Sequence, residues 1–252
     1  SPASASSTVA SSAPPAAPEP APGARLVADV VPQRYQLELE VDPNKPTFTG
    51  LVRIEIETGA SHSSLFLHGK DLSVRSAKVH SADTVRSAQV SAIAEQTMLR
   101  LDLDSALPAG KHTLELRYEA PFGAGLAGLY RVEVAGHWYA YTQFEALDAR
   151  AAFPCFDEPA FKTPFEVTLV VPKDDLAIGN TRVNEEKVSG TTRRVAFSPT
   201  EKLPTYLVAF AVGPFDVVQA APIPASRVRT RELPLRGVAV KGKGPLLQKA
   251  LE

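Results

Sequence analysis

Cysteine is almost absent from this sequence, which sets a first limit on its chemistry. Cys155 is the only cysteine in 252 residues, so the chain has no internal disulfide and no multi-cysteine metal site. Long apolar runs are missing too: no stretch approaches the roughly 18 consecutive apolar residues that a membrane-spanning helix needs. No segment of this sequence is therefore expected to span a membrane.

The sequence also lacks an excess of charge of either sign. Its 27 Lys and Arg residues nearly balance its 28 Asp and Glu residues, and no basic stripe is present, so the charge pattern gives no case for a nucleic-acid partner. The hydrophobic fraction of 44% is ordinary for a globular protein. It is enough for a sizeable core in one large or two small domains.

The N-terminal segment has almost no residues that could build a core. Twenty of the first 24 residues are Ala, Pro or Ser, Glu19 carries the only charge, and no aromatic residue occurs. We therefore predict a disordered, protease-sensitive linker over residues 1–25. The chain begins at Ser1 and shows no signal peptide, so its natural start is expected to have been removed or processed. Such tethers often follow the cleaved signal of an exported bacterial protein, which suggests a location in the cell envelope or outside the cell.

Short strands dominate residues 26–220. Tyr35, Leu37, Leu39 and Val41 alternate with polar residues, a period of two that is typical of a half-buried strand. The other predicted strands are Phe48–Ile56, Leu65–Leu67, Leu99–Leu103, Thr113–Glu119, Phe165–Val171, Arg194–Phe197 and the continuously apolar Tyr206–Val212. No amphipathic helical stretch interrupts these strands. This pattern predicts an all-β domain, an antiparallel β-sandwich.

The last part of the chain, residues 221–252, has a different pattern. Residues 228–240 are expected to form another strand pair, and Gly244-Pro245 precedes apolar residues at helical spacing. No C-terminal cap signal follows. The chain is therefore expected to end inside an element, at the truncated beginning of a second domain.

The most informative stretch is Thr142–Pro159, which reads TQFEALDARAAFPCFDEP. It has no regular period, and it mixes aromatic residues, Arg150 and several carboxylates where a plain loop would be more polar and richer in glycine. Gln143 and Glu145 lie on the same side if this part is extended. The residues alone indicate a structured loop that is a candidate for function.

Three motifs in this order resemble the aminopeptidase N family of zinc metallo-aminopeptidases. Thr142–Phe165 is similar to the family's TQFE…AR…FPCFDEP…K…F segment. Gly128–Arg131 (GLYR) resembles a family element upstream, and Pro204–Phe210 (PTYLVAF) resembles a family strand downstream. Three ordered motifs are far more specific than a single short pattern, and the resemblance covers residues 26–252.

The resemblance implies a saddle-like N-terminal β-domain that packs against a thermolysin-like catalytic domain downstream and lends one loop to the active site. In the family, the loop glutamate binds the free α-amine of a peptide substrate, and the loop glutamine lines the first specificity pocket. These roles fall on Glu145 and Gln143. The competing interpretations are a salt-bridged loop carboxylate for Glu145 and loop packing for Gln143.

The family's zinc-binding helix, His-Glu-x-x-His, is not found in this sequence. None of the five histidines is followed by Glu, and no two of them are four residues apart. The family's Gly-x-Met-Glu-Asn strand is also missing, because Met98 is the only methionine. We therefore expect no catalytic or metal-ligating residue in this chain, and we expect the zinc of a parent enzyme to be bound elsewhere. The alternative function is a non-catalytic β-sandwich binding module with the same fold.

The remaining reactive side chains of the loop are predicted to be structural. Asp157 and Glu158 are adjacent, so they are unsuited to a facing acid–base pair, and we expect them to pair with Arg150. Cys155 has no evident histidine partner and is expected to be a small buried residue.

Overall fold

The computed structural model describes residues 19–23 and 25–251, so most of the predicted linker lies outside the described residues. The strands are β1 Val30–Glu40, β2 Thr47–Thr58, β3 His62–His68, β4 Ser73–His80, β5 Val85–Ile93, β6 Met98–Leu107, β7 Gly110–Pro121, β8 Gly128–Val134, β9 His137–Gln143, β10 Phe165–Pro172, β11 Leu176–Gly179, β12 Val183–Ser189, β13 Thr192–Phe197, β14 Phe210–Gly213, β15 Asp216–Ile223 and β16 Leu233–Ala239. The helical elements are the 3₁₀ turns η1 Ala94–Gln96, η2 Ala149–Ala151, η3 Thr205–Leu207 and η4 Gly244–Leu247, and the helix α1 Gln248–Leu251. None of the described helices is long and apolar enough to cross a membrane.

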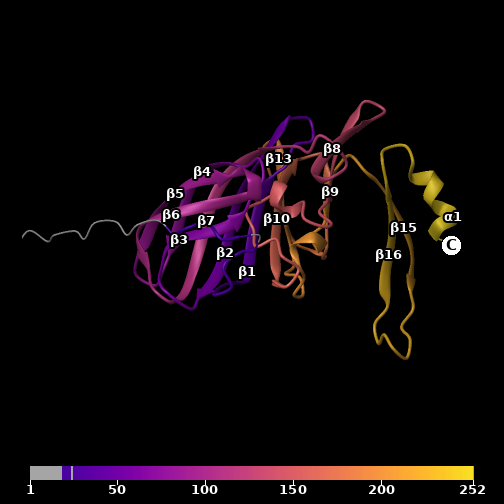
Figure 1. Cartoon of the computed structure of the whole chain (residues 1–252). Coiled ribbons are helices and arrows are strands. Elements are labelled where there is room, and N and C mark those ends of the chain that lie inside the picture. The colour runs from indigo at the N-terminus through magenta and orange to yellow at the C-terminus, as the bar shows by residue number, and fades with distance from the viewer. Residues whose placement is uncertain (1–18, 24, 252) are drawn as a thin grey trace, which may run out of the picture.

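Three sheets build the molecule (Figure 1). A ten-stranded sheet has the order β12-β13-β10-β1-β2-β7-β4-β5-β6-β3, a four-stranded sheet has the order β11-β14-β9-β8, and β15 pairs with β16 alone. One hydrophobic core contains buried side chains from both the ten-stranded and the four-stranded sheet. Within it, Leu37, Ile54, Leu101 and Leu116 are fully buried. The prediction of a mostly-β fold is confirmed.

The large sheet is mixed, which corrects the expectation of an antiparallel sandwich. The chain leaves β1, builds eight further strands, and returns at β10, which runs parallel to β1 with Tyr35 opposite Phe165. The other pairings in this sheet are antiparallel. Parallel neighbours need a long crossover connection, and here that connection carries β2 to β9 and the loop after them.

The predicted strand at Tyr206–Val212 is wrong in its first half. Thr205–Leu207 forms the 3₁₀ turn η3, and the strand begins only at Phe210. The Thr205 hydroxyl donates to Asp157, and the Leu207 side chain is 50% exposed. The turn η3 therefore takes up the first part of the apolar run Tyr206–Val212 and brings Thr205 into contact with Asp157 of the Thr142–Pro159 loop.

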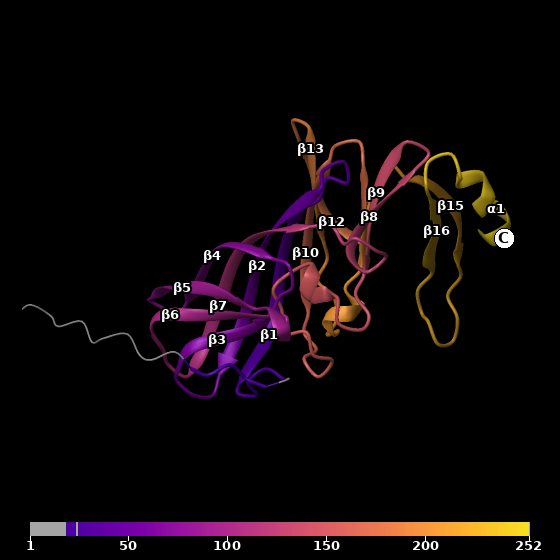
Figure 2. The same cartoon turned by 45° about the horizontal axis from the view of Figure 1, so that its top comes forward.

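The last four elements, β15, β16, η4 and α1, form a separate unit (Figures 1 and 2). The predicted strand pair at residues 228–240 is displaced, because β16 pairs with the earlier β15 rather than within that range. The helix start predicted after Gly244-Pro245 is confirmed as η4 and α1. Leu247 and Leu251 of these turns cover Gly237 on one side of the hairpin.

Glu19, which we had placed in the linker, contacts the folded part of the chain. Its carboxylate accepts hydrogen bonds from the Ser63 amide at 2.8 Å and lies 3.3 Å from Nδ1 of His62. The other ring nitrogen of His62 faces Asp29 at 3.2 Å. These contacts fix the start of the described chain against β3.

Asp175 is a buried carboxyl whose titration yields a stability prediction. Burial, followed by the charges of Asp42 and Asp174, raises the pKa of Asp175 to about 6. The folded chain therefore holds this proton more tightly than the unfolded chain, so stability falls as the pH rises from the ordinary pKa of about 4 to the folded pKa of about 6, and the full cost is present above pH 6. We expect Asp175→Asn to raise the free energy of unfolding at pH 7 by about 1–2 kcal/mol.

Urea unfolding at pH 7 and at pH 4 tests this prediction. The gain should shrink toward zero at the lower pH, because Asp175 is then protonated in the folded wild-type chain as well. The matched control is Asp83→Asn in the exposed β4–β5 turn, which should change stability little at either pH. An Asp175→Asn variant no more stable than wild type at pH 7 would contradict the cost we assign to the buried charge.

Candidate functional site

The loop predicted from the sequence begins where β9 ends. Gln143 is the last residue of β9 and lies opposite Gly128 of β8. Phe144 is buried, with its ring in edge-on contact with Phe153 at 5.9 Å and with Phe210 at 6.4 Å between centroids. Gln143 and Glu145 on either side of it are exposed. The buried Phe144 ring therefore leaves both candidate side chains exposed; the sequence predicted only that they lie on the same side of an extended segment.

Glu145 presents a free carboxylate at the tip of the loop. Its backbone N–H donates to Oε1 of Gln143 at 3.2 Å, so the two residues are held together. The peptide bond from Glu145 to Ala146 is cis. Within the part of the chain that the structure describes, no basic side chain forms an ion pair with Glu145. The salt-bridge interpretation of Glu145 thus finds no partner in the described residues.

The three sequence motifs meet around this loop. Gly128 of the first motif pairs with Gln143 of the second. The hydroxyl of Thr142 accepts a hydrogen bond from the Phe210 amide at 3.0 Å, which joins the second motif to the third. A second link is the hydrogen bond from Thr205 to Asp157. Motifs that are far apart in the sequence therefore form one rigid base under Glu145.

A buried ion pair holds the far side of the loop. Nε of Arg150 lies 2.9 Å from Oδ2 of Asp157, and both side chains are buried. The Arg150 guanidinium also donates to the Thr97 hydroxyl at 2.7 Å and to the Asp157 carbonyl at 3.2 Å. The predicted pairing of Arg150 is confirmed for Asp157. Glu158 instead accepts a hydrogen bond from the Leu26 amide at 2.7 Å.

His68 completes this cluster as a neutral side chain. The Asp157 amide donates to Nδ1 of His68 at 3.1 Å, so the ring proton lies on Nε2. Burial, followed by the Arg150 charge, lowers the pKa of His68 to about 4. The backbones of His68 and Cys155 exchange two hydrogen bonds, which tie the loop to the end of β3.

Cys155 is fully buried, as predicted. Burial raises the pKa of its thiol well above the ordinary value, which suits a packing role and not a nucleophile. Two tyrosine hydroxyls complete the support of the loop: Tyr35 accepts from the Phe156 amide, and Tyr118 donates to the Ala152 carbonyl, both at 2.9 Å.

Sequence reasoning missed the partners that hold the loop from other strands. His68, Thr97 and Thr205 each contact Arg150 or Asp157, but none stands in a spacing that marks it. The one available signal was the presence of both Arg150 and Asp157 in the same loop, because a buried Arg or Asp needs several hydrogen-bond partners.

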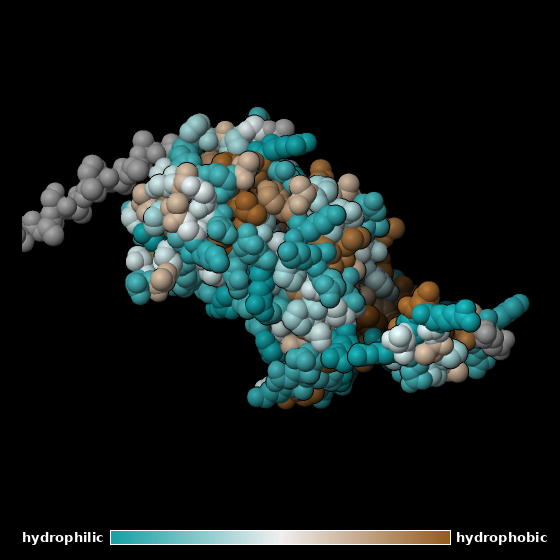
Figure 3. Space-filling view, turned by 90° about the horizontal axis from the view of Figure 1, so that it is seen from below, coloured by the Kyte–Doolittle hydropathy of each residue, from teal (hydrophilic) through white to brown (hydrophobic). Residues whose placement is uncertain are grey.

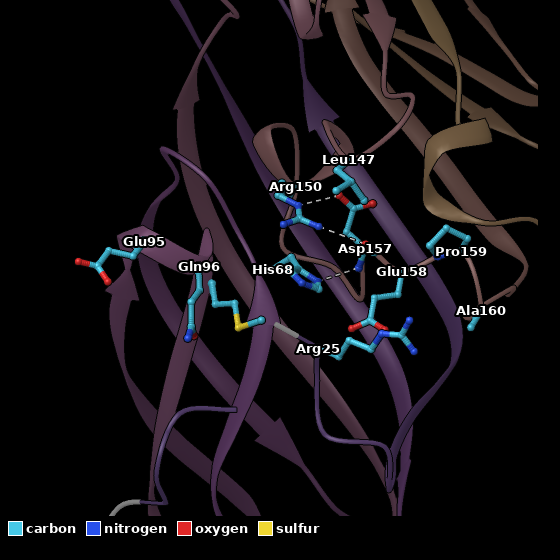
Figure 4. Close-up of a pocket in the computed structure, with 11 residues that line it drawn as sticks. Arg25, His68, Glu95, Gln96, Leu147, Arg150, Asp157, Glu158, Pro159 and Ala160 are labelled. Carbon is cyan, nitrogen blue, oxygen red and sulfur yellow. Dashed lines mark hydrogen bonds and ion pairs between the residues drawn. The ribbon is translucent and has the colours of Figure 1, made fainter. Parts of the chain in front are cut away.

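A cleft of about 730 Å³ lies beside this cluster (Figure 4). Its lining comes from the end of β3, from η1 and β6, and from the loop, and includes His68, Gln96, Met98, Leu147 and Arg150. Gln143 and Glu145 do not line it.

The residues present do not fit a zinc site. Among residues 19–23 and 25–251, no three His, Cys, Asp or Glu side chains come together in an arrangement that could hold a metal ion. The five histidines stand on four different strands and in separate surroundings.

The geometry therefore defines a class: an all-β domain that presents an anchored loop with an unpaired glutamate, and that has no metal centre in its described residues. Comparison with known proteins makes the assignment specific. The model of the peptidase M1 N-terminal domain matches residues 31–207, and the chain belongs to this family.

Individual relatives agree with this assignment. The chain is 38% identical over 215 residues to aminopeptidase M1-A of Oryza sativa subsp. japonica, a match that covers 82% of this chain and 24% of the relative. It is 37% identical to aminopeptidase M1 of Arabidopsis thaliana, with 77% and 23% covered. It is 30% identical to a puromycin-sensitive aminopeptidase of Caenorhabditis elegans, with 78% and 22% covered. The chain thus spans about a quarter of the length of these relatives.

Proposed function

We propose that this chain is the substrate-amine-binding domain of a zinc aminopeptidase that removes N-terminal residues from peptides. Glu145 binds the α-ammonium of the substrate, and Gln143 lies beside the side chain of the first residue. The observation that carries the proposal is the exposed, unpaired Glu145 on a loop whose neighbours on both sides are anchored in the core.

The chemistry of an exopeptidase explains why a fixed carboxylate is needed. A substrate ammonium and a carboxylate form a charge-assisted hydrogen bond, which is stronger than one between neutral groups. A rigid carboxylate also fixes the distance from the chain end to the scissile bond. It thereby limits cleavage to the first peptide bond. The anchored Phe144 and the Arg150–Asp157 pair supply this rigidity.

In this proposal the zinc and the general base belong to a part of the parent protein that follows these 252 residues. The boundary predicted from the sequence, between residues 220 and 221, falls inside β15; because the β15–β16 hairpin and α1 form their own unit, we propose a boundary before Asp216 instead. The hairpin exposes Val217, Ile223 and Leu233, and apolar side chains are visible where it faces the body (Figure 3). We assign the exposed apolar side chains of the hairpin to contact with the catalytic domain. The Ala/Pro/Ser segment is proposed to be the tether of an exported protein.

The purified 252-residue chain is expected not to bind zinc stoichiometrically and not to hydrolyse aminoacyl-anilides. The physical reason is that the described residues offer no ligand set with the right donors and spacing. Zinc analysis after dialysis and a chromogenic peptidase assay measure both properties. Tight one-to-one zinc together with activity that co-purifies with the chain would contradict the proposed division of labour.

A further inference from the structure

A serine and a histidine outside the Thr142–Pro159 loop are held together in the arrangement of a nucleophile and its base. Ser81 opens the turn that follows β4, and His112 lies on β7, the strand that pairs with β4. The pairing of the two strands brings these residues side by side, and Oγ of Ser81 lies 2.9 Å from Nδ1 of His112. A serine within hydrogen-bond reach of an imidazole is the first requirement of an activated hydroxyl.

A backbone carbonyl fixes the tautomer of this histidine. Nε2 of His112 lies 2.9 Å from the carbonyl oxygen of Pro108. A carbonyl oxygen can only accept, so Nε2 carries the proton, and in the neutral ring Nδ1 is the acceptor for the Ser81 hydroxyl. The Pro108 carbonyl therefore orients the base, which is the task of the third group in a nucleophile–base–orienter arrangement.

An arginine stabilises negative charge on the serine oxygen. The Arg86 guanidinium donates to Oγ of Ser81 at 3.0 Å, and a guanidinium cannot accept, so the hydroxyl proton is directed to His112 instead. The positive charge beside Oγ favours the alkoxide as this proton leaves. The Ser81 amide donates to the Thr84 carbonyl at 2.8 Å, which holds the backbone of the turn. Both the position of the oxygen and the direction of its proton are thus set by the fold.

The pair opens into a cleft of about 430 Å³, within the range of pockets for small organic ligands. Ser81 is half-buried and His112 is 7% exposed, and both line this cleft, so a ligand there meets the nucleophile while the base is shielded from bulk water. The charged side chains of the lining are Glu55, Glu57 and Lys111. Two carboxylates against one ammonium disfavour an anionic substrate.

We propose that Ser81 is the nucleophile of a second site, which hydrolyses carboxylic esters with a small uncharged acyl group. Oγ attacks the ester carbonyl carbon while Nδ1 of His112 takes its proton; the bond from this carbon to the alcohol oxygen breaks, and the alcohol leaves with that proton. Water then attacks the acyl-serine with the help of the same base, which releases the carboxylic acid and restores the hydroxyl. Lys111 lines the cleft and supplies positive charge for the oxyanion. The proposal does not depend on the role of Glu145.

The test uses the 252-residue chain and diisopropyl fluorophosphate, an uncharged reagent that phosphorylates activated serines with loss of fluoride. Mass spectrometry of the intact chain and of its peptides should find one adduct, located at Ser81. Ser81→Ala should give no adduct, whereas Ser91→Ala, which removes an exposed serine on β5, should be labelled as fast as wild type. His112→Gln should slow labelling about 100-fold, as expected for the loss of a general base. Hydrolysis of 4-nitrophenyl acetate by wild type should exceed that by Ser81→Ala.

A matched pair of cysteine variants tests the same environment without a change at the buried histidine. Ser81→Cys should react with iodoacetamide at pH 7 about tenfold faster than Ser91→Cys, because the neighbouring arginine and imidazole raise the thiolate fraction. The native Cys155 is buried and should not react in either folded variant. Equal rates for the two introduced thiols would mean that the surroundings of residue 81 activate no nucleophile.

Three further results would overturn the proposal: no adduct on wild type under conditions that fully label a serine protease alongside, an adduct at a residue other than Ser81, or equal labelling rates for wild type and a folded His112→Gln. Circular dichroism and urea unfolding of each variant separate a loss of reactivity from a loss of folding. Equal hydrolysis of 4-nitrophenyl acetate by wild type and Ser81→Ala would likewise show that Ser81 takes no part in ester cleavage.

Discussion

Asp157→Ala is expected to lower the free energy of unfolding by roughly 3–5 kcal/mol, as when one member of a buried ion pair is removed. The loss has a clear physical origin. Arg150 would keep its buried position without the carboxylate that its Nε contacts at 2.9 Å, and the Thr205 hydroxyl would lose its acceptor. Urea unfolding at pH 7, followed by circular dichroism, measures the change.

Two further variants make this measurement specific to the buried pair. Asp157→Asn should lose less, because the amide oxygen can still accept the hydrogen bond from Thr205. Asp83→Ala removes an exposed carboxylate in the β4–β5 turn and should change stability by no more than about 0.5 kcal/mol. If Asp157→Ala lost no more than this exposed control, the loop would be held by its aromatic anchors and not by the pair.

The second large effect concerns Glu145 in the longer enzyme that contains this domain. Glu145→Ala should cost roughly 3–5 kcal/mol of transition-state stabilisation, because the substrate ammonium would lose its counter-charge in a closed site. Glu145→Gln should cost less, since the amide oxygen can still accept from the ammonium. Comparison of kcat/KM for the three proteins measures the series.

Acetylated substrates provide the control for the role of Glu145. An N-acetylated peptide has no ammonium, so its slow hydrolysis should scarcely respond to Glu145→Ala. The stability of the isolated domain should also stay within about 0.5 kcal/mol, because the side chain is exposed. If kcat/KM for free-amine substrates stayed within about twofold of wild type, a difference of ~0.4 kcal/mol, Glu145 would not be the amine anchor.

The strands that the sequence predicted well are those with one buried face. Alternation in Tyr35–Val41 and in Thr113–Glu119 marked β1 and β7, because every second side chain enters the core. β12 went unrecognised for the opposite reason: all its residues are exposed, so no apolar period exists. β5 is also mostly exposed.

Pairing partners were harder to predict than strands. Nothing in the local pattern of Phe165–Val171 indicates that it lies parallel to a strand more than a hundred residues earlier, because register and direction depend on which surfaces meet. The candidate site shows the same limit. Alternation predicted only that Gln143 and Glu145 lie on the same side of the segment, whereas the contacts from His68, Thr97 and Thr205 depend on the tertiary fold.

The parallel pairing of β1 with β10 has a consequence for the synthesis of this protein. Tyr35 must wait for Phe165, 130 positions later, and at 5–20 residues per second a ribosome needs roughly 7–26 s to supply that stretch. During this interval β1 can pair with β2, but its other edge has no neighbour and is open to strands of other nascent chains. Completion of the large sheet is therefore a late event, governed by closure of a long loop, and the emerging polypeptide needs protection from aggregation until β10 arrives.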